Sequence, residues 1–264
     1  MKLNLLACCI ILLFSCKSET KVESQILQKE TPTTQAKEVL HMEIHKVMGQ
    51  FEPSQDDNFT LVDKKHADRE GMYIHKDTYK AFQDMWAHAQ REGVDLVIRS
   101  ATRNFDYQKG IWERKWTGQT KVSGQDLSKT ISNHKERALE ILHYSSMPGT
   151  SRHHWGSDLD FNSFDNSYFE SGTGLKVYDW LVQNAPTYGF FRPYTEKGEA
   201  RPHGYEEEKW HWSYQPLAIQ YMTTANTELK NEMIQGFKGS ETALEINVVD
   251  KYVKGVSTFE SQER

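Results

Sequence analysis

Apolar residues recur at intervals of three or four along several stretches, the spacing that places them on one face of a helix. Between positions 79 and 89 the apolar residues keep this spacing, Asp77 is a suitable N-cap, and Gly93 marks an end. The same pattern predicts helices that begin near Val39 and that cover 105–116, 126–143 and 175–184. The chain therefore has substantial helical content.

Short apolar or alternating runs predict strands at 95–99, 158–161 and 209–214. Turn-forming residues predict loops at 49–58 and 145–151. We therefore expect an α+β fold in which helices pack on a small, mainly antiparallel sheet.

No internal repeat is visible, and no linker interrupts positions 60–220. We expect one domain over 39–228, followed by a C-terminal extension of unknown role at 229–264. The extension is charged but contains an apolar run at 246–253, and the pattern does not decide whether it packs on the domain.

The N-terminus has a different character. Lys2 precedes an apolar run that ends at Phe14 and is shorter than the roughly 20 residues of a spanning helix. The run leads into Leu-Phe-Ser-Cys16, which resembles a bacterial lipoprotein cleavage box, although Phe14 is bulky for its place. We expect a signal peptide at 1–15, lipidation of Cys16 and a polar tether at 16–38. The alternative is an ordinary signal peptide cut near the same place.

Composition narrows the possibilities further. The formal net charge is −5, so no basic excess supports a nucleic-acid partner. Two of the three cysteines, Cys8 and Cys9, lie in the predicted signal, which leaves Cys16 alone. We expect a mature chain without disulfides or thiolate chemistry.

Two short segments hold the candidate chemistry. The first runs from Ser151 to Asp160 and contains His153; the second runs from Glu208 to Trp212 and contains His211. Three protein ligands around zinc leave one position for a water molecule, whose pKa then falls towards about 7. A nearby carboxylate outside the ligand set can act as general base. The histidines and carboxylates of the two segments are of the types that such a zinc site needs. Their spacing is not that of the helical His-Glu-x-x-His pattern.

The complete motifs are more specific. Ser-x-His-x-x-Gly-x-x-x-Asp followed by Glu-x-Trp-His resembles the D-alanyl-D-alanine carboxypeptidase family of zinc peptidases. That family includes the vancomycin-resistance D,D-carboxypeptidases and D,D-dipeptidases, and its zinc fold is shared with the Hedgehog signalling domain. The similarity covers about 75–216. Further landmarks follow in order: Arg99 to Arg103, Tyr107-Gln108, Pro148-Gly149, and the block from Asp179 to Phe190.

The resemblance implies one Zn²⁺ per chain, bound by His153, Asp160 and His211, with Glu208 as general base. Arg103 would neutralise negative charge on the substrate, on either its terminal carboxylate or the developing oxyanion. The resemblance also implies four further substrate-binding residues beside Arg103: Ser151, Tyr107, Gln108 and Trp210.

The sequence departs from the family pattern at Thr102, at Asp158 and at Lys209 within Glu-Lys-Trp-His. Asp158 is a candidate for holding a ligand histidine, and His154 is more typical of packing or support than of metal binding. Glu208 and His211 are three apart, so on an ideal strand they would face opposite sides. A bend at Glu208 is required if both reach the metal.

The leading hypothesis is a peptidase that releases terminal D-alanine from peptidoglycan stem peptides. An L-alanyl-D-glutamate or cross-bridge endopeptidase of the same fold is one alternative. A non-catalytic wall-binding module with structural zinc is another. We expect a monomer, anchored by lipid in the cell envelope and facing the periplasm or the cell surface.

Overall fold

A computed structural model describes residues 41–257 of the chain. The predicted signal peptide, Cys16 and the tether lie outside the described residues, as does the end of the chain from 258. Within the described part, no helix is both long and apolar enough to cross a bilayer.

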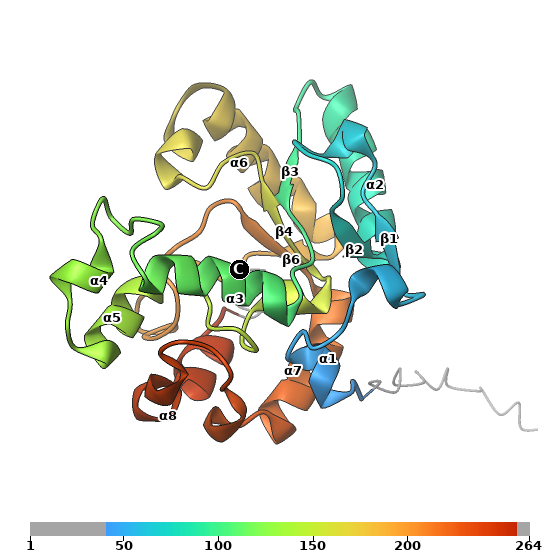
Figure 1. The fold of residues 1–264 in the computed structure, drawn as a ribbon. Helices are drawn as coiled ribbons and strands as arrows, with labels where there is room; N and C mark the ends of the chain where they lie inside the picture. The colour runs from blue at the N-terminus through green and yellow to red at the C-terminus, as the bar shows by residue number, and fades with distance from the viewer. Residues whose placement is uncertain (1–40, 258–264) are drawn as a thin grey trace, which may run out of the picture. The chain divides into compact units, whose positions relative to one another are not determined.

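A four-stranded antiparallel sheet lies at the centre, in the order β3-β4-β6-β5 (Figure 1). Its strands are β3 (Ile98–Ser100), β4 (Asp158–Phe161), β6 (His211–Tyr214) and β5 (Phe190–Phe191). A separate antiparallel pair joins β1 (Phe59–Leu61) to β2 (Tyr73–His75). These sheets and the surrounding helices confirm the predicted α+β class.

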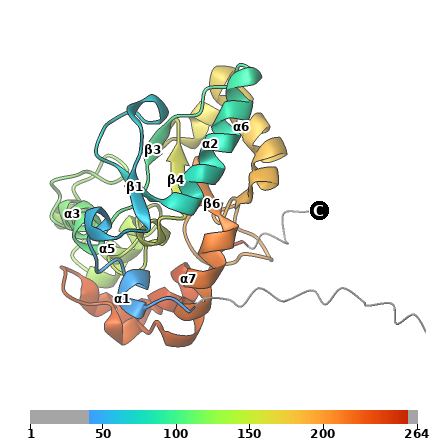
Figure 2. The ribbon, with the colours of Figure 1, turned by 90° about the vertical axis from the view of Figure 1, so that its right-hand side faces the viewer.

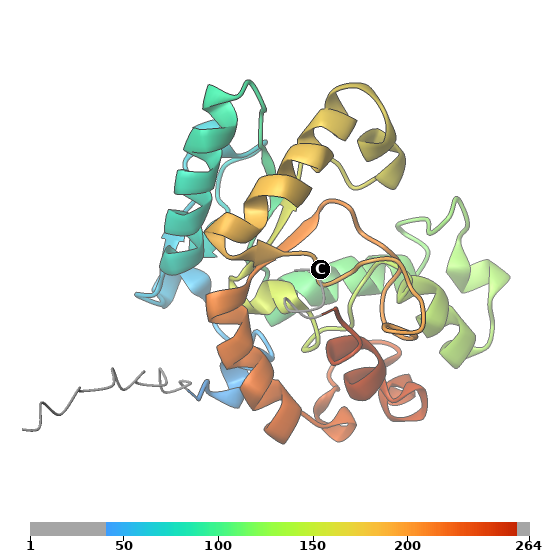
Figure 3. The ribbon, with the colours of Figure 1, turned by 180° about the vertical axis from the view of Figure 1, so that it is seen from behind.

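Two long helices pack on one face of the sheet, the face nearer the viewer in Figure 3: α2 (Lys76–Arg91) and α6 (Gly172–Asn184). Phe82 and Met85 of α2 and Leu181 of α6 are fully buried in one apolar cluster. The same cluster contains Leu159 and Phe161, the alternate residues of β4. Because strand residues alternate between faces, Asp158 and Asp160 point to the other side.

The remaining helices lie on that other side and below the sheet in Figures 1 and 2. They are α1 (Ile44–Val47), α3 (Phe105–Trp116), α4 (Leu127–Thr130), α5 (His134–Ile141), α7 (Gln215–Glu228) and α8 (Ala243–Ile246). Single turns of 3-10 helix and a short π-helix, Val249–Val253, connect them. The helix predicted at 105–116 has the bounds of α3.

Other predicted boundaries need correction. Asp77 is not the cap of α2: β2 runs directly into the helix, and the ring of His75 accepts a hydrogen bond from the backbone N–H of Asp77. The single helix predicted over 126–143 is two helices, because the Asn133 side chain caps a new start by accepting from Glu136 N at 3.1 Å. Asn133 itself is extended and so cannot continue α4.

The strand predicted at 95–99 begins at Ile98, because the side-chain oxygen of Asn162 accepts from Val97 N, where a neighbouring strand would otherwise pair. The strand predicted at 209–214 begins at His211, after a turn closed by His211 N and Glu208 O at 3.3 Å. The predicted loop at 49–58 contains a turn of 3-10 helix, Pro53–Gln55.

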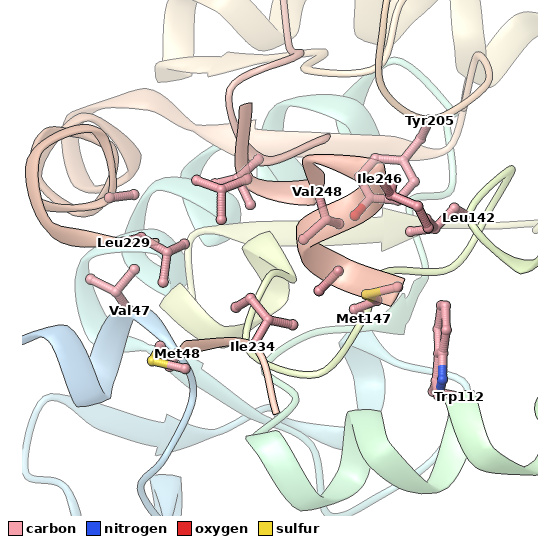
Figure 4. Close-up of a cluster of buried hydrophobic side chains, with 14 of the residues drawn as sticks. Val47, Met48, Trp112, Leu142, Met147, Tyr205, Leu229, Ile234, Ile246 and Val248 are labelled. Atoms are coloured by element: carbon pink, nitrogen blue, oxygen red, sulfur yellow. The ribbon is translucent and has the colours of Figure 1, made fainter. Parts of the chain in front are cut away.

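The segment after 228 packs into the same apolar cluster as α3 and α5, which answers the question that the pattern left open. Figure 4 shows Ile234, Ile246 and Val248 beside Met147, with Trp112 of α3 nearby. All five of these side chains are at most 2% exposed. Residues 229–257 are therefore part of the folded core.

Candidate metal centre

Strand pairing brings the candidate ligands together. Asp160 of β4 lies opposite His211 of β6, and both side chains point away from the α2 and α6 face. His153 comes from a 3-10 turn, Arg152–Trp155, which leads into β4 through Gly156. Gly156 has φ +70°, and an added Cβ would meet Phe59 at 2.5 Å, so this position of the motif requires glycine.

One ligand atom each from His153, Asp160 and His211 lies within 4.8 Å of the other two. His153 Nε2 is 3.2 Å from Asp160 Oδ2, and His211 Nδ1 is 3.0 Å from Asp160 Oδ1. All three side chains are buried. His153 Nε2 and Asp160 Oδ1 have no hydrogen-bond partner within the described chain, which is costly unless another group binds them.

The partners of the histidines fix which nitrogen is free. His153 Nδ1 donates to Ala101 O at 2.8 Å, so Nε2 carries the lone pair. His211 Nε2 donates to Asp158 Oδ2 at 2.8 Å, so Nδ1 is the nitrogen that a metal ion would bind in place of a proton. His153 Nε2 and His211 Nδ1 both face Asp160. Two imidazole nitrogens, each on a ring that an outer partner orients, together with a carboxylate form a donor set that suits zinc.

Asp158 is itself held by four donors. Its Oδ2 also accepts from Arg152 Nε at 2.9 Å, and its Oδ1 accepts from the hydroxyls of Ser157 and Ser213. Burial alone would raise the pKa of Asp158, but the Arg152 guanidinium and then His211 hold it well below its ordinary value. The carboxylate is therefore ionised and supports His211, as the sequence suggested for this position.

The bend required at Glu208 is present. The turn before β6 places Glu208 Oε2 3.4 Å from His211 Nδ1, on the same side of the sheet as the ligands. Burial raises the pKa of Glu208, while the hydrogen bond to His211 opposes the rise. Burial alone would lower the pKa of His211, but Asp158, Asp160 and Glu208 raise it well above its ordinary value. This negative surrounding favours a bound cation.

Arg103 is tied to the ligand segment through its backbone. Its N–H donates to His153 O at 3.1 Å, and its carbonyl accepts from His154 Nδ1 at 2.6 Å. Burial lowers the pKa of His154 to about 3, so this ring is neutral and supports Arg103 without binding the metal. Arg99, four residues earlier in the same segment, pairs with Asp68 at 2.7 Å.

A cavity of about 600 Å³ opens onto the site. Arg103, Asp160, Glu208 and Trp210 line it, so the structure brings these four predicted residues together. Trp210 forms an aromatic wall with Tyr144 and Phe164, whose ring centroids lie 6.3 and 6.4 Å from its own.

Three predicted substrate residues do not line this cavity. Tyr107 lies in the first turn of α3, where it is 53% exposed and lines a neighbouring cleft. Gln108 faces the core and donates to Ser146 O at 2.8 Å. Ser151 is buried at the start of the 3-10 turn, and its hydroxyl has no partner in the part of the chain described.

Sequence reasoning missed Lys115, Ser145 and Asn166, which also line the cavity. Ile111 and Lys115 are one turn apart on the predicted helix 105–116, so the sequence predicts that they share a face of this helix. No signal in the sequence indicated that this face meets the metal ligands.

The family model described as VanY: D-alanyl-D-alanine carboxypeptidase matches residues 71–217, more than half of the chain. The chain belongs to this D-alanyl-D-alanine carboxypeptidase family, as the motifs indicated.

Individual relatives are distant. The chain is 28% identical to the putative carboxypeptidase YodJ of Bacillus subtilis (strain 168), over 63% of this chain and 55% of that protein. It is 32% identical to an uncharacterized protein of Haemophilus influenzae, over 26% of this chain and 60% of that one. The chain therefore covers less than two thirds of the length of each of these two relatives.

Solved structures resemble the chain loosely. VanYB in complex with D-alanine-D-alanine is 25% identical, with 67% of this chain and 92% of that chain covered and a TM-score of 0.47. A single-residue mutant of the vancomycin resistance D,D-pentapeptidase VanY, in complex with Zn(II), is 24% identical, with 72% and 91% covered and a TM-score of 0.47.

Proposed function

We propose that this protein is a zinc-dependent peptidase that removes the terminal D-alanine from D-alanyl-D-alanine in peptidoglycan stem peptides. Family membership supports the class of reaction. The observation that carries the proposal is the convergence of His153, Asp160 and His211, with two of their buried ligand atoms unpartnered within residues 41–257. The three side chains would hold one Zn²⁺.

When bound, zinc supplies a Lewis acid that activates water and polarises the peptide carbonyl. Glu208 accepts a proton from the attacking water molecule as the oxygen of that water bonds to the carbonyl carbon. The same carboxyl group then donates a proton to the nitrogen of the leaving D-alanine as the C–N bond breaks. Arg103 provides a permanent positive charge for the anionic substrate. Trp210, which lines the cavity, would wall the bound peptide.

The first prediction concerns metal removal and the base. We expect EDTA to abolish release of free D-alanine from a synthetic stem pentapeptide, and added zinc to restore it. Glu208→Gln should retain zinc by metal analysis but lose at least about a hundredfold in kcat, because it cannot accept the proton.

Glu206→Gln is the matched control, since Glu206 belongs to the same acidic run but pairs with Lys197 and does not line the cavity. Its activity should equal that of the wild type. Full hydrolysis by Glu208→Gln would remove the base assignment. Release of internal fragments instead of D-alanine would identify an endopeptidase, and binding of wall fragments without cleavage would indicate a non-catalytic module.

We also propose that Cys16 is lipidated and that the protein works as a monomer at the envelope. The cleavage box supports lipidation, and a place at the envelope agrees with the location of peptidoglycan outside the cytoplasmic membrane. In a bacterial host, Cys16→Ser should move the protein from the membrane fraction to the soluble fraction on immunoblots. Retention of the Cys16→Ser variant in the membrane fraction would contradict lipid anchoring.

A further inference from the structure

The proposed chemistry leaves one cation of the cavity without a role. Lys115 lies on α3 one turn after Ile111, and both residues line the cavity that contains Asp160 and Glu208. Its ammonium group donates to the hydroxyl of Ser145, in the loop after α5. No carboxylate of residues 41–257 forms an ion pair with Lys115 or with Arg103, although other ion pairs are spread over that whole part of the chain.

The charges of the cavity do not cancel. Asp160 and Glu208 together would offset one divalent metal ion, which would leave Arg103 and Lys115 as two cations that neither of these carboxylates offsets. Asp165 also lines the cavity, but it is exposed, and its carboxylate accepts from Ser167 N, where it caps a 3-10 turn. Burial lowers the pKa of Lys115, and the neighbouring Arg103 adds to this effect while Glu208 opposes it. An anionic ligand would relieve the repulsion between the two cations.

Hydrolysis at the end of a peptide presents two negative charges. One is the carboxylate of the leaving residue, and the other develops on the carbonyl oxygen in the transition state. The backbone of Arg103 is bonded to His153 O and to His154 Nδ1, so this residue lies beside the segment that contains the metal ligand His153. Lys115 is instead fixed to the loop at Ser145, through a group that is not part of the metal centre.

We propose that Lys115, oriented by Ser145, binds the terminal carboxylate of the stem peptide and leaves Arg103 to stabilise the oxyanion. This assignment rests on the proposed function and adds to it the residue that binds the end of the substrate. It makes Lys115 the residue that restricts the enzyme to peptides with a free C-terminus. A substrate whose terminal carboxylate is blocked would lose this contact alone.

The test compares two synthetic peptides ending in D-Ala-D-Ala, one with a free carboxylate and one with a C-terminal amide. The wild type should prefer the free acid. In Lys115→Gln, we expect the KM for the acid to rise about ten- to a hundredfold, the loss typical of a charged hydrogen bond, with kcat little changed. Hydrolysis of the amide should be unaffected, so the preference disappears.

Lys115→Arg should restore most of the preference, because it keeps the charge. Lys109→Gln is the matched control, since Lys109 lies on the same helix but does not line the cavity. Zinc content and the melting temperature of each variant verify that the site is intact. If Lys115→Gln keeps the wild-type acid preference, Lys115 does not bind the carboxylate, and the proposed function stands. If zinc-loaded wild type releases no D-alanine, both proposals fail.

Discussion

At the scale of single residues, the candidate ligand His211 depends on side chains that do not line the cavity. His211 is bonded to Asp158, Asp158 to Arg152, and the guanidinium of Arg152 to Ser213 at 2.6 Å. The charged pair is at most 2% exposed, and Arg152 also stacks over Trp155 at 4.5 Å. Such an arrangement fixes the ring of His211 in one orientation and one tautomer.

Removing the negative charge of Asp158 should therefore weaken metal binding. We expect Asp158→Asn to raise the dissociation constant for zinc about 10- to 100-fold, measured by competition with a chromophoric chelator. The melting temperature should also fall, because Arg152 is left buried without its partner. Affinity is measured below the melting transition, so that loss of structure does not mimic loss of affinity.

Asp179→Asn serves as the control, since Asp179 is exposed on α6. The zinc dissociation constant and the melting temperature of Asp179→Asn should match those of the wild type. Wild-type zinc affinity in Asp158→Asn would show that Asp158 supports the fold alone.

At the scale of the elements, capping decides where helices begin. Asn104 caps α3 by accepting from Tyr107 N at 2.9 Å, so the helix begins at Phe105. Asn133 does the same for α5 and divides what the apolar pattern presents as one helix. The cap of α2 is a histidine, His75, and its acceptor nitrogen is lost when the ring is protonated.

This cap predicts a pH dependence. Burial lowers the pKa of His75 below its ordinary value of 6.5. At pH values between the lowered pKa of His75 and 6.5, this ring is protonated in the unfolded chain but neutral in the folded chain. The free energy of unfolding therefore falls as the pH drops below 6.5. His75→Asn keeps an acceptor that does not titrate. We expect its urea-unfolding free energy to decline less over this range, by up to about 1 kcal/mol.

The comparison between wild type and His75→Asn removes the contribution of other buried histidines such as His66, which both proteins share. Parallel pH profiles of the two proteins would show that the His75 ring does not titrate with folding.

At the scale of the whole molecule, the chain after 228 completes the core beneath the site. Phe237 contacts Trp112 of α3 with ring centroids 5.9 Å apart, and Trp112 donates from its indole to Lys238 O at 2.8 Å. This segment therefore supports α3, the helix that contributes Lys115 to the cavity. A domain that ended at 228 would leave that face of α3 uncovered.

Ile246→Ala tests this role. Ile246 is 2% exposed, so its truncation should cost about 2–5 kcal/mol in unfolding free energy. Leu244 lies on the same short helix, α8, but is 58% exposed, and Leu244→Ala should change stability by no more than about 0.5 kcal/mol. Equal effects of the two substitutions in urea denaturation would contradict a core role for the segment.

Several elements of the fold and the residues of the metal site could be predicted from the sequence, because the patterns that indicate them are local. Helix 105–116 and strand 158–161 are predicted with their correct bounds, since cap, periodicity and turn lie within a few residues. The motifs also identify His153, Asp160, His211 and Glu208 as one chemical group. The break at Asn133 is missed because an asparagine within an apolar pattern does not show whether it faces solvent or caps a helix.

The sequence by itself determined the class of protein and the types of metal ligand, because those are properties of short motifs. Only the tertiary structure decided that Asp158 supports His211, 53 residues away, and that Tyr107 and Gln108 lie away from the cavity. It also decided that Lys115 shares that cavity with Arg103. Such contacts join segments far apart in the chain, so they depend on how the sheet and helices pack and not on local preference.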